Sequence, residues 1–237
     1  MGSGLFEQQP IFSIFLSIVI IRLIIRPGLL SFHVKKIDLT LLLSKRCYTG
    51  TLKAFSGAME LRGTHAPAGH HQRVAFVVHG IAKEMGLPDS SAEGLWLAAH
   101  VYDISLMNMP AEIFMGASQL TGRKLALYRN YPQLSYDILE AVDFPWPIDD
   151  IVLQHRECFD GSGYPRGIKR EDILIEARML AVAVAIEDLT SHRIFREAFT
   201  LKQAFVEISE HRGSQYDPNV VDACLRLFKE KSYKIEG

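Results

Sequence analysis

Helical spacing dominates the sequence from Leu52 to Lys231. Apolar residues recur three or four positions apart, as at Val74, Val77 and Val78, which is the pattern of one buried helix face. The alternation typical of half-buried strands is essentially missing from this stretch. The pattern predicts an all-α domain, with helices expected over residues 52–61, 70–85, 90–104, 123–131, 134–142, 175–189, 201–210 and 218–231 and a shorter segment after Pro110.

The first fifty residues differ from the rest. Residues 11–21 are apolar apart from two serines, but Arg22 and Arg26 interrupt the run before it reaches Leu30. A membrane-spanning helix needs about 20 mostly apolar residues, so this run is marginal. The basic residues that follow would keep the rest of the chain in the cytoplasm. An inner-membrane anchor over residues 11–30, a buried or interaction helix, and a segment foreign to the domain all remain open. We therefore divide the chain into a leader, 1–50, and a helical domain, 51–237.

Charge and cysteine content exclude several classes of protein. The net charge is −1, which gives no reason to expect a nucleic-acid polymer as partner. The three cysteines are far apart and form no C-x-x-C pair. This suits a reducing compartment and argues against a disulfide framework or a thiolate zinc site.

The stretch Gln154–Gly167 combines a histidine, acids, arginines and a Gly-Tyr-Pro corner: Q-H-R-E-C-F-D-G-S-G-Y-P-R-G. Glycine tolerates backbone angles that other residues resist, and Pro165 fixes its own φ. These residues are poor helix formers and predict a loop. On composition alone, the loop is either a surface turn or part of a functional site.

Seven segments in order carry a resemblance to a known family. They are G-H-H-Q-R-V at 69–74, Y-D-I-S-L-M-N-M-P at 102–110, Y-P-Q-L-S-Y-D-I-L at 131–139, H-R-E-C-F-D-G-S-G-Y-P at 155–165, A-R-M-L-A-V-A-V at 177–184, L-T-S-H-R-I-F-R at 189–196 and Q-Y-D-P at 215–218. Together they resemble the HD-GYP family, bacterial phosphodiesterases that degrade cyclic di-GMP. The resemblance implies an HD-superfamily helical bundle of the HD-GYP type.

The resemblance also implies a site with metal ligands, of which this sequence keeps only a part. The kept ligands are His70, Asp103 and His155, and Asp103 would be catalytic if the site is active. The substituted ligand positions are Tyr102, Tyr131, Arg156 and Val184, and the family's acidic ligand and lysine fall on Ala66 and Leu106. An active site of this kind would hold divalent iron or manganese; with these substitutions we expect no metal cofactor.

The substitutions work against metal binding for physical reasons. A neutral phenol is a poor ligand, and the arginine cation repels a metal ion. Arg156 either takes the place of the metal charge or pairs with Asp103 or Glu157 and stabilises a metal-free core; both alternatives remain open. His100, Glu187 and Asp188 are the nearby residues that could compensate, whereas His71 and His79 read as ordinary helix residues.

The phosphate-facing elements are retained. The resemblance assigns substrate binding to Arg193 together with Gly163, Tyr164 and Pro165. An arginine fork suits a phosphate group well.

Three functions follow as hypotheses. The first is a degenerate HD-GYP domain, catalytically impaired, that works as a regulatory or interaction module in cyclic di-GMP signalling. It would bind cyclic di-GMP, or protein partners through the Gly-Tyr-Pro loop, and could form a homo-oligomer. The second is a residual metal-dependent cyclic di-GMP phosphodiesterase. The third is a non-functional fragment joined to an unrelated leader.

Overall fold

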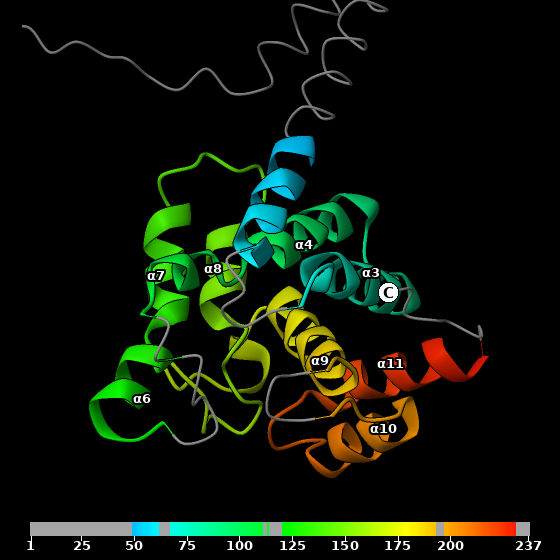
Figure 1. Cartoon of the computed structure of the whole chain (residues 1–237). Helices are drawn as coiled ribbons and strands as arrows, with labels where there is room; N and C mark the ends of the chain where they lie inside the picture. Colours follow the sequence, from blue (N-terminus) through cyan, green and yellow to red (C-terminus); the bar gives the residue numbers. More distant parts are fainter. Residues whose placement is uncertain (1–48, 62–66, 111–112, 114–119, 193–196, 231–237) are drawn as a thin grey trace, which may run out of the picture. The chain divides into compact units, whose positions relative to one another are not determined.

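The computed structural model describes residues 49–61, 67–110, 113, 120–192 and 197–230 (Figure 1). These residues contain helices and the isolated bridge Arg212–Tyr216, but no strand, so the all-α prediction is confirmed. A helix over residues 49–61 precedes α3 (His70–Glu84), α4 (Asp89–Val101), η1 (Ile104–Asn108), α6 (Gly122–Arg129), α7 (Tyr131–Leu139), α8 (Ile148–Gln154), η3 (Arg170–Asp172), α9 (Ile175–Thr190), α10 (Leu201–Glu210) and α11 (Pro218–Glu230).

Helix α3 forms the centre of the domain and packs against α4, α9 and α11 (Figure 1). Its apolar face, with Val74, Val77, Val78 and Ile81, is completely buried. Burying one such aliphatic side chain contributes about 1.5–3 kcal/mol. The predicted helix face is therefore the one that forms the core, and it places the first residues of α3 inside the protein.

The turn before α3 depends on a glycine. Gly69 has a φ of 77°, in the left-handed region that glycine adopts without steric penalty. The chain therefore enters α3 abruptly, and His70 and His71 are its first two helical residues. Both side chains are buried.

Helix α8 is held against α4 by a close approach of backbone to side chain. A Cβ atom on Gly94 of α4 would lie 2.5 Å from Cγ of Trp146, which is two residues before the start of α8. Helix α8 also packs on α7 and α9. His155, at its C-terminal end, is thereby brought into the same core as the start of α3.

Several helix boundaries differ from the prediction. Helix α4 ends at Val101, and the chain continues through Tyr102 and Asp103 into the 3-10 helix η1. Helix α7 begins at Tyr131 rather than Leu134, with Pro132 in its first turn, where the missing N–H costs nothing.

Part of the prediction falls outside the described residues. This holds for the proposed anchor at residues 11–30, for Ala66 and for nearly all of the segment after Pro110. The division at residue 50 stays a prediction. Among the helices that the structure describes, none has the length and apolar character needed to cross a membrane.

Candidate functional site

His71 lies between two carboxylates in the interior. Its Nδ1 is 2.9 Å from Oε1 of Glu60, and its Nε2 is 2.8 Å from Oδ1 of Asp103. Burial alone would lower the pKa of His71, but the two acids outweigh it and raise that pKa to about 10. His71 is therefore an imidazolium at neutral pH. The prediction that it is an ordinary helix residue was wrong.

Glu60 also closes the start of α3. Its carboxylate accepts hydrogen bonds from the backbone N–H of Gly69 at 2.7 Å and of His71 at 3.0 Å. These donors have no partner within the helix, and an acid is favourable at this end of the helix dipole. Burial raises the pKa of Glu60, but its bonds to His71 and Gly69 prevail and lower it to about 2. Glu60 thus positions His71 and the start of α3 while carrying a full negative charge.

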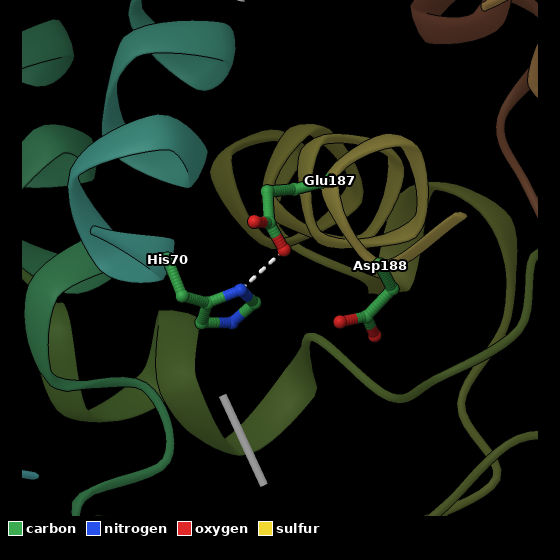
Figure 2. Close-up of side chains that lie close together, drawn as sticks. All are labelled: His70, Glu187 and Asp188. Carbon is green, nitrogen blue, oxygen red and sulfur yellow. Dashed lines mark hydrogen bonds and ion pairs between the residues drawn. The ribbon is translucent and has the colours of Figure 1, made fainter. Parts of the chain in front are cut away.

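His70 has different partners on each ring nitrogen. Its Nε2 is 2.6 Å from the hydroxyl of Tyr102, and its Nδ1 pairs with Glu187 of α9. In Figure 2 the carboxylates of Glu187 and Asp188 both project from α9 toward this ring. A histidine oriented by a carboxylate on one nitrogen is a familiar arrangement at metal sites, where the other nitrogen is the ligand.

Glu187 is itself bound by a cation. Arg73 donates to its Oε1 from Nε at 3.0 Å and from Nη2 at 2.7 Å, and Ser191 donates from Oγ at 2.6 Å. Burial raises the pKa of Glu187, but its bonds to His70, Ser191 and Arg73 prevail and lower it to about 2. The charge of Glu187 is therefore balanced by Arg73 without a metal ion.

His155 is surrounded by neutral and positive groups. Its Nδ1 lies 2.5 Å from the carbonyl of Val152, and its Nε2 lies 2.7 Å from the Tyr131 hydroxyl. Burial, together with the charge of Arg156, lowers the pKa of His155 to about 3, so the ring is neutral. In that state Nδ1–H donates to Val152, and the lone pair on Nε2 accepts from the Tyr131 O–H.

Arg156 completes this chain of hydrogen bonds. Its Nε donates to the Tyr131 hydroxyl at 2.5 Å, and its guanidinium lies 5.7 Å from the centre of the Tyr131 ring. Of the alternatives that the sequence left open, the pairing of Arg156 with Asp103 or Glu157 is not found among the ion pairs of the described residues. Asp103 is bound by His71, and Glu157 accepts from the backbone N–H of Arg166 at 2.6 Å.

The Gly-Tyr-Pro loop packs tightly against the segment that follows His155. A Cβ on Gly163 would lie 2.1 Å from the backbone nitrogen of Cys158 and 2.6 Å from the Arg156 carbonyl, distances that no side chain tolerates. That same carbonyl accepts a hydrogen bond from the Tyr164 N–H at 3.1 Å. Tyr164 and Pro165 are partly exposed, so this corner of the loop reaches the surface.

The predicted ligands lie together, but their donor atoms do not suit a pair of metal ions. The Tyr102 ring is 6.2 Å from the His70 ring and 5.1 Å from the His155 ring, so both histidines share one core. Val184 is buried and has no donor atom. Burial raises the pKa of Tyr102 and of Tyr131 well above 10, which keeps both phenols neutral.

A single ion has a better set of donors. His70, Glu187 and Asp188 each place one ligand atom within 4.8 Å of the others (Figure 2). Imidazole and carboxylate groups suit first-row metals. These three residues could hold one metal ion if it replaced the direct hydrogen bond between His70 and Glu187.

Two other predicted candidates are placed differently. His100 stacks on Trp96 with 4.0 Å between ring centres, and its Nδ1 lies 2.9 Å from the Trp96 carbonyl. Burial lowers the pKa of His100 to about 4, and the residue is not among the clustered metal donors of the described chain. Arg193 lies outside the described residues.

Sequence reasoning missed the supporting residues Glu60, His71 and Arg73. Arg73 could have been noticed, because it lies one helical turn after His70 and so shares its face. Glu60 has no such signal. It belongs to a separate helix and meets His71 only through the fold.

Comparison with known proteins decides the family. The HD domain family matches residues 61–220, about two-thirds of the chain. The chain belongs to the HD domain family. This HD domain is 32% identical over 180 residues to the "Cyclic di-GMP phosphodiesterase response regulator RpfG" of Xanthomonas campestris, covering 74% of this chain and 47% of that protein. It is 33% identical over 163 residues to the "Cyclic di-GMP phosphodiesterase" of Thermotoga maritima, covering 68% and 44%.

Solved structures support the same fold. Bd1817, an HDG"Y"P protein from Bdellovibrio bacteriovorus, superposes with a TM-score of 0.56 at 21% identity, covering 68% of this chain and 51% of the other. The HD-GYP resemblance of the sequence is thereby confirmed at the level of family and fold. The chain spans about half the length of the curated relatives that it matches.

Proposed function

We propose that this HD domain is a cyclic di-GMP-binding module of bacterial signalling whose hydrolytic site is impaired. One observation carries the proposal: Nε2 of His70 and Nε2 of His155 both hydrogen-bond a tyrosine hydroxyl, at 2.6 and 2.7 Å. The relatives named as cyclic di-GMP phosphodiesterases support the ligand class.

The tyrosines oppose metal binding at the atoms where the family would need it. The lone pair of His155 Nε2 already accepts the Tyr131 proton, and the adjacent Arg156 adds a fixed positive charge. Asp103 is likewise held by the charged His71. A metal ion would have to break these bonds and overcome the repulsion from two cations.

The test is to measure metal and activity on one sample of the full chain. We expect iron and manganese well below one ion per chain by elemental analysis, no turnover of cyclic di-GMP, and binding of cyclic di-GMP by calorimetry. A variant with all four ligand positions changed, Tyr102→His, Tyr131→His, Arg156→His and Val184→Asp, serves as a positive control for metal uptake. Near-stoichiometric paired metal with turnover in the unmodified chain would sink the proposal.

A second function is favoured by the cluster of His70, Glu187 and Asp188. In this alternative the domain is a residual phosphodiesterase that uses one metal ion to activate water and hold a phosphate oxygen. It predicts turnover that depends on added manganese or iron. Asp188→Asn should then abolish turnover, whereas the surface change Asp222→Asn should not.

A further inference from the structure

Within the described residues, the cations of the buried cluster (His71, Arg73 and Arg156) are paired with carboxylates, with the exception of Arg156. The cation of His71 lies between Glu60 and Asp103, and the cation of Arg73 lies on Glu187. Arg156 forms no ion pair with any carboxylate of the described residues. The charge of Asp188 acts on Arg156, but no ion pair joins the two side chains. The half of the cluster near α8 therefore carries a positive charge without a bound counter-ion.

The guanidinium of Arg156 has a hydrogen-bond partner at Nε but none at its two terminal amino groups among the described residues. Its Nε is engaged by the Tyr131 hydroxyl, which anchors the group over the Tyr131 ring. No described residue accepts a hydrogen bond from its two terminal amino groups. The side chain is partly exposed, and neither amino group is among the fully buried polar atoms that lack a hydrogen-bond partner in the described residues. Two parallel N–H donors are the arrangement that binds two phosphate oxygens at once.

The groups around Arg156 suit a nucleotide phosphate. The Tyr128 ring is tilted against that of Tyr131, with 5.5 Å between ring centres, and Tyr128 is only partly buried. Arg129, the next residue, lies 5.5 Å above the ring of Tyr164 in the Gly-Tyr-Pro loop. Two partly exposed aromatic rings, Tyr128 and Tyr164, thus lie near Arg156, and a second cation lies over one of them.

We propose that Arg156 is a phosphate-binding residue, which grips one phosphate of a phosphodiester ligand through its two terminal amino groups. Arg129 adds positive charge at the rim. Arg156 thereby supplies fixed positive charge at a position where the family's resemblance implies a metal ligand. The choice of cyclic di-GMP as ligand rests on the proposed function; the phosphate contact itself does not.

Binding titrations on the full chain test this directly. The probes are cyclic di-GMP, its linear product pGpG and inorganic phosphate, each followed by calorimetry. We expect Arg156→Met to weaken cyclic di-GMP binding roughly 10- to 100-fold, the loss typical of a hydrogen-bonded charged pair. Arg156→Lys should recover part of the affinity, because it restores the charge without the fork. Arg212→Ala, at an exposed pair with Asp222, is the matched control and should bind as the unmodified chain does.

The outcomes separate the two proposals. Equal affinity of Arg156→Met and the unmodified chain would overturn the Arg156 assignment and leave the binding module intact. Turnover by the unmodified chain, together with lost binding in Arg156→Met, would overturn the impaired site and leave Arg156 as a phosphate residue. Binding of pGpG or phosphate but not of cyclic di-GMP would keep the contact and change the ligand. If none of the three probes binds, the assignment of Arg156 fails.

A measurement on the unmodified chain guards against misfolded variants. Phenylglyoxal modifies accessible arginines, and peptide mapping identifies which ones react. We expect Arg156 to react, and saturating cyclic di-GMP to protect it while Arg212 stays reactive. Failure of the ligand to protect Arg156, at a concentration where calorimetry shows binding, would also overturn the assignment.

Discussion

The histidine cluster consists of His70 and His71 at the start of α3 and His155 at the end of α8. The two ends surround their buried rings with opposite kinds of chemical group. At the start of α3, His70 and His71 are each bound by carboxylates, from Glu187 and from Glu60 with Asp103. At the end of α8, His155 has a carbonyl, a phenol and an arginine around it, and no carboxylate pairs with it among the described residues.

The difference shows how protonation follows from neighbours rather than from burial. His71 and His155 are equally buried, yet the pKa of His71 rises to about 10 and that of His155 falls to about 3. The negative charges beside His71 outweigh the effect of its desolvation on the pKa. The positive charge of Arg156 instead lowers the pKa of His155 further, in the same direction as desolvation. The α3 end holds acids that can attract a cation, whereas the α8 end is where we propose that an anion binds.

The strongest way to break the comparison is to remove the acid that holds His71. Asp103→Ala leaves a buried imidazolium with only Glu60, and losing one partner of a buried pair typically costs about 3–5 kcal/mol. We expect a loss of that size in the free energy of unfolding from urea titration at pH 7. The control Asp222→Ala removes an exposed pair and should cost less than about 1 kcal/mol. Equal losses in the two variants would contradict the ion triad.

Lowering the pH should reduce the free energy of unfolding through His155, at the end of α8, and through His100. The folded pKa values of His155 and His100, about 3 and about 4, lie below the ordinary 6.5, so unfolding takes up protons. This stability is fully present above pH 6.5 and is lost as the pH falls. The slope should approach about 1.4 kcal/mol per pH unit for each histidine. Urea titrations between pH 6.5 and 5 check this, and His155→Asn should remove about half of the slope. An unchanged slope in that variant would show that His155 is not buried in its neutral form.

Raising the pH should reduce the free energy of unfolding through His71, at the start of α3. The folded pKa of His71 is about 10, above the ordinary 6.5, so unfolding releases a proton between these values. Its contribution is complete below about pH 6.5 and is lost as the pH rises toward 10, with a slope of at most about 1.4 kcal/mol per pH unit. Urea titrations at pH 7 and pH 9 should show this fall. His71→Gln should flatten it, and a fall of the same size in His71→Gln would assign the effect elsewhere.

The smallest expected effect, close to zero, is that of restoring a single ligand position on metal content and turnover. Arg156→His alone should restore neither metal content nor cyclic di-GMP turnover, because Val184 and the phenols of Tyr102 and Tyr131 remain. Elemental analysis and a turnover assay on that variant check this. Recovery of both properties from the single change would show that the phenols can act as ligands.

The sequence-based prediction succeeded where the residues that decide the structure are close to one another in the sequence. The spacing of Val74, Val77 and Ile81 predicts α3 and its buried face, because those residues are neighbours within one helix. The ordered segments placed His70, Asp103 and His155 in one site, and the structure brings them into one core.

The failures concern partners that only the tertiary structure brings together. His71 was read as an ordinary residue because neither Glu60 nor Asp103 is its neighbour on α3. An acid partner was one possibility for Arg156, because unlike charges attract, yet its hydrogen bond goes to the Tyr131 hydroxyl at the start of α7. Charge alone could not choose between them, because the choice depends on how α7 and α8 pack.

The crowding at Gly163 bears on how such proteins are recognised from sequence. The position admits no Cβ, because the backbones of Cys158 and Arg156 already fill the space. A glycine is therefore needed there to let the loop close, whatever chemistry takes place several residues away. The Gly-Tyr-Pro signature in a sequence therefore indicates the fold. Working phosphodiesterases in a genome should be identified from the residues at the ligand positions instead.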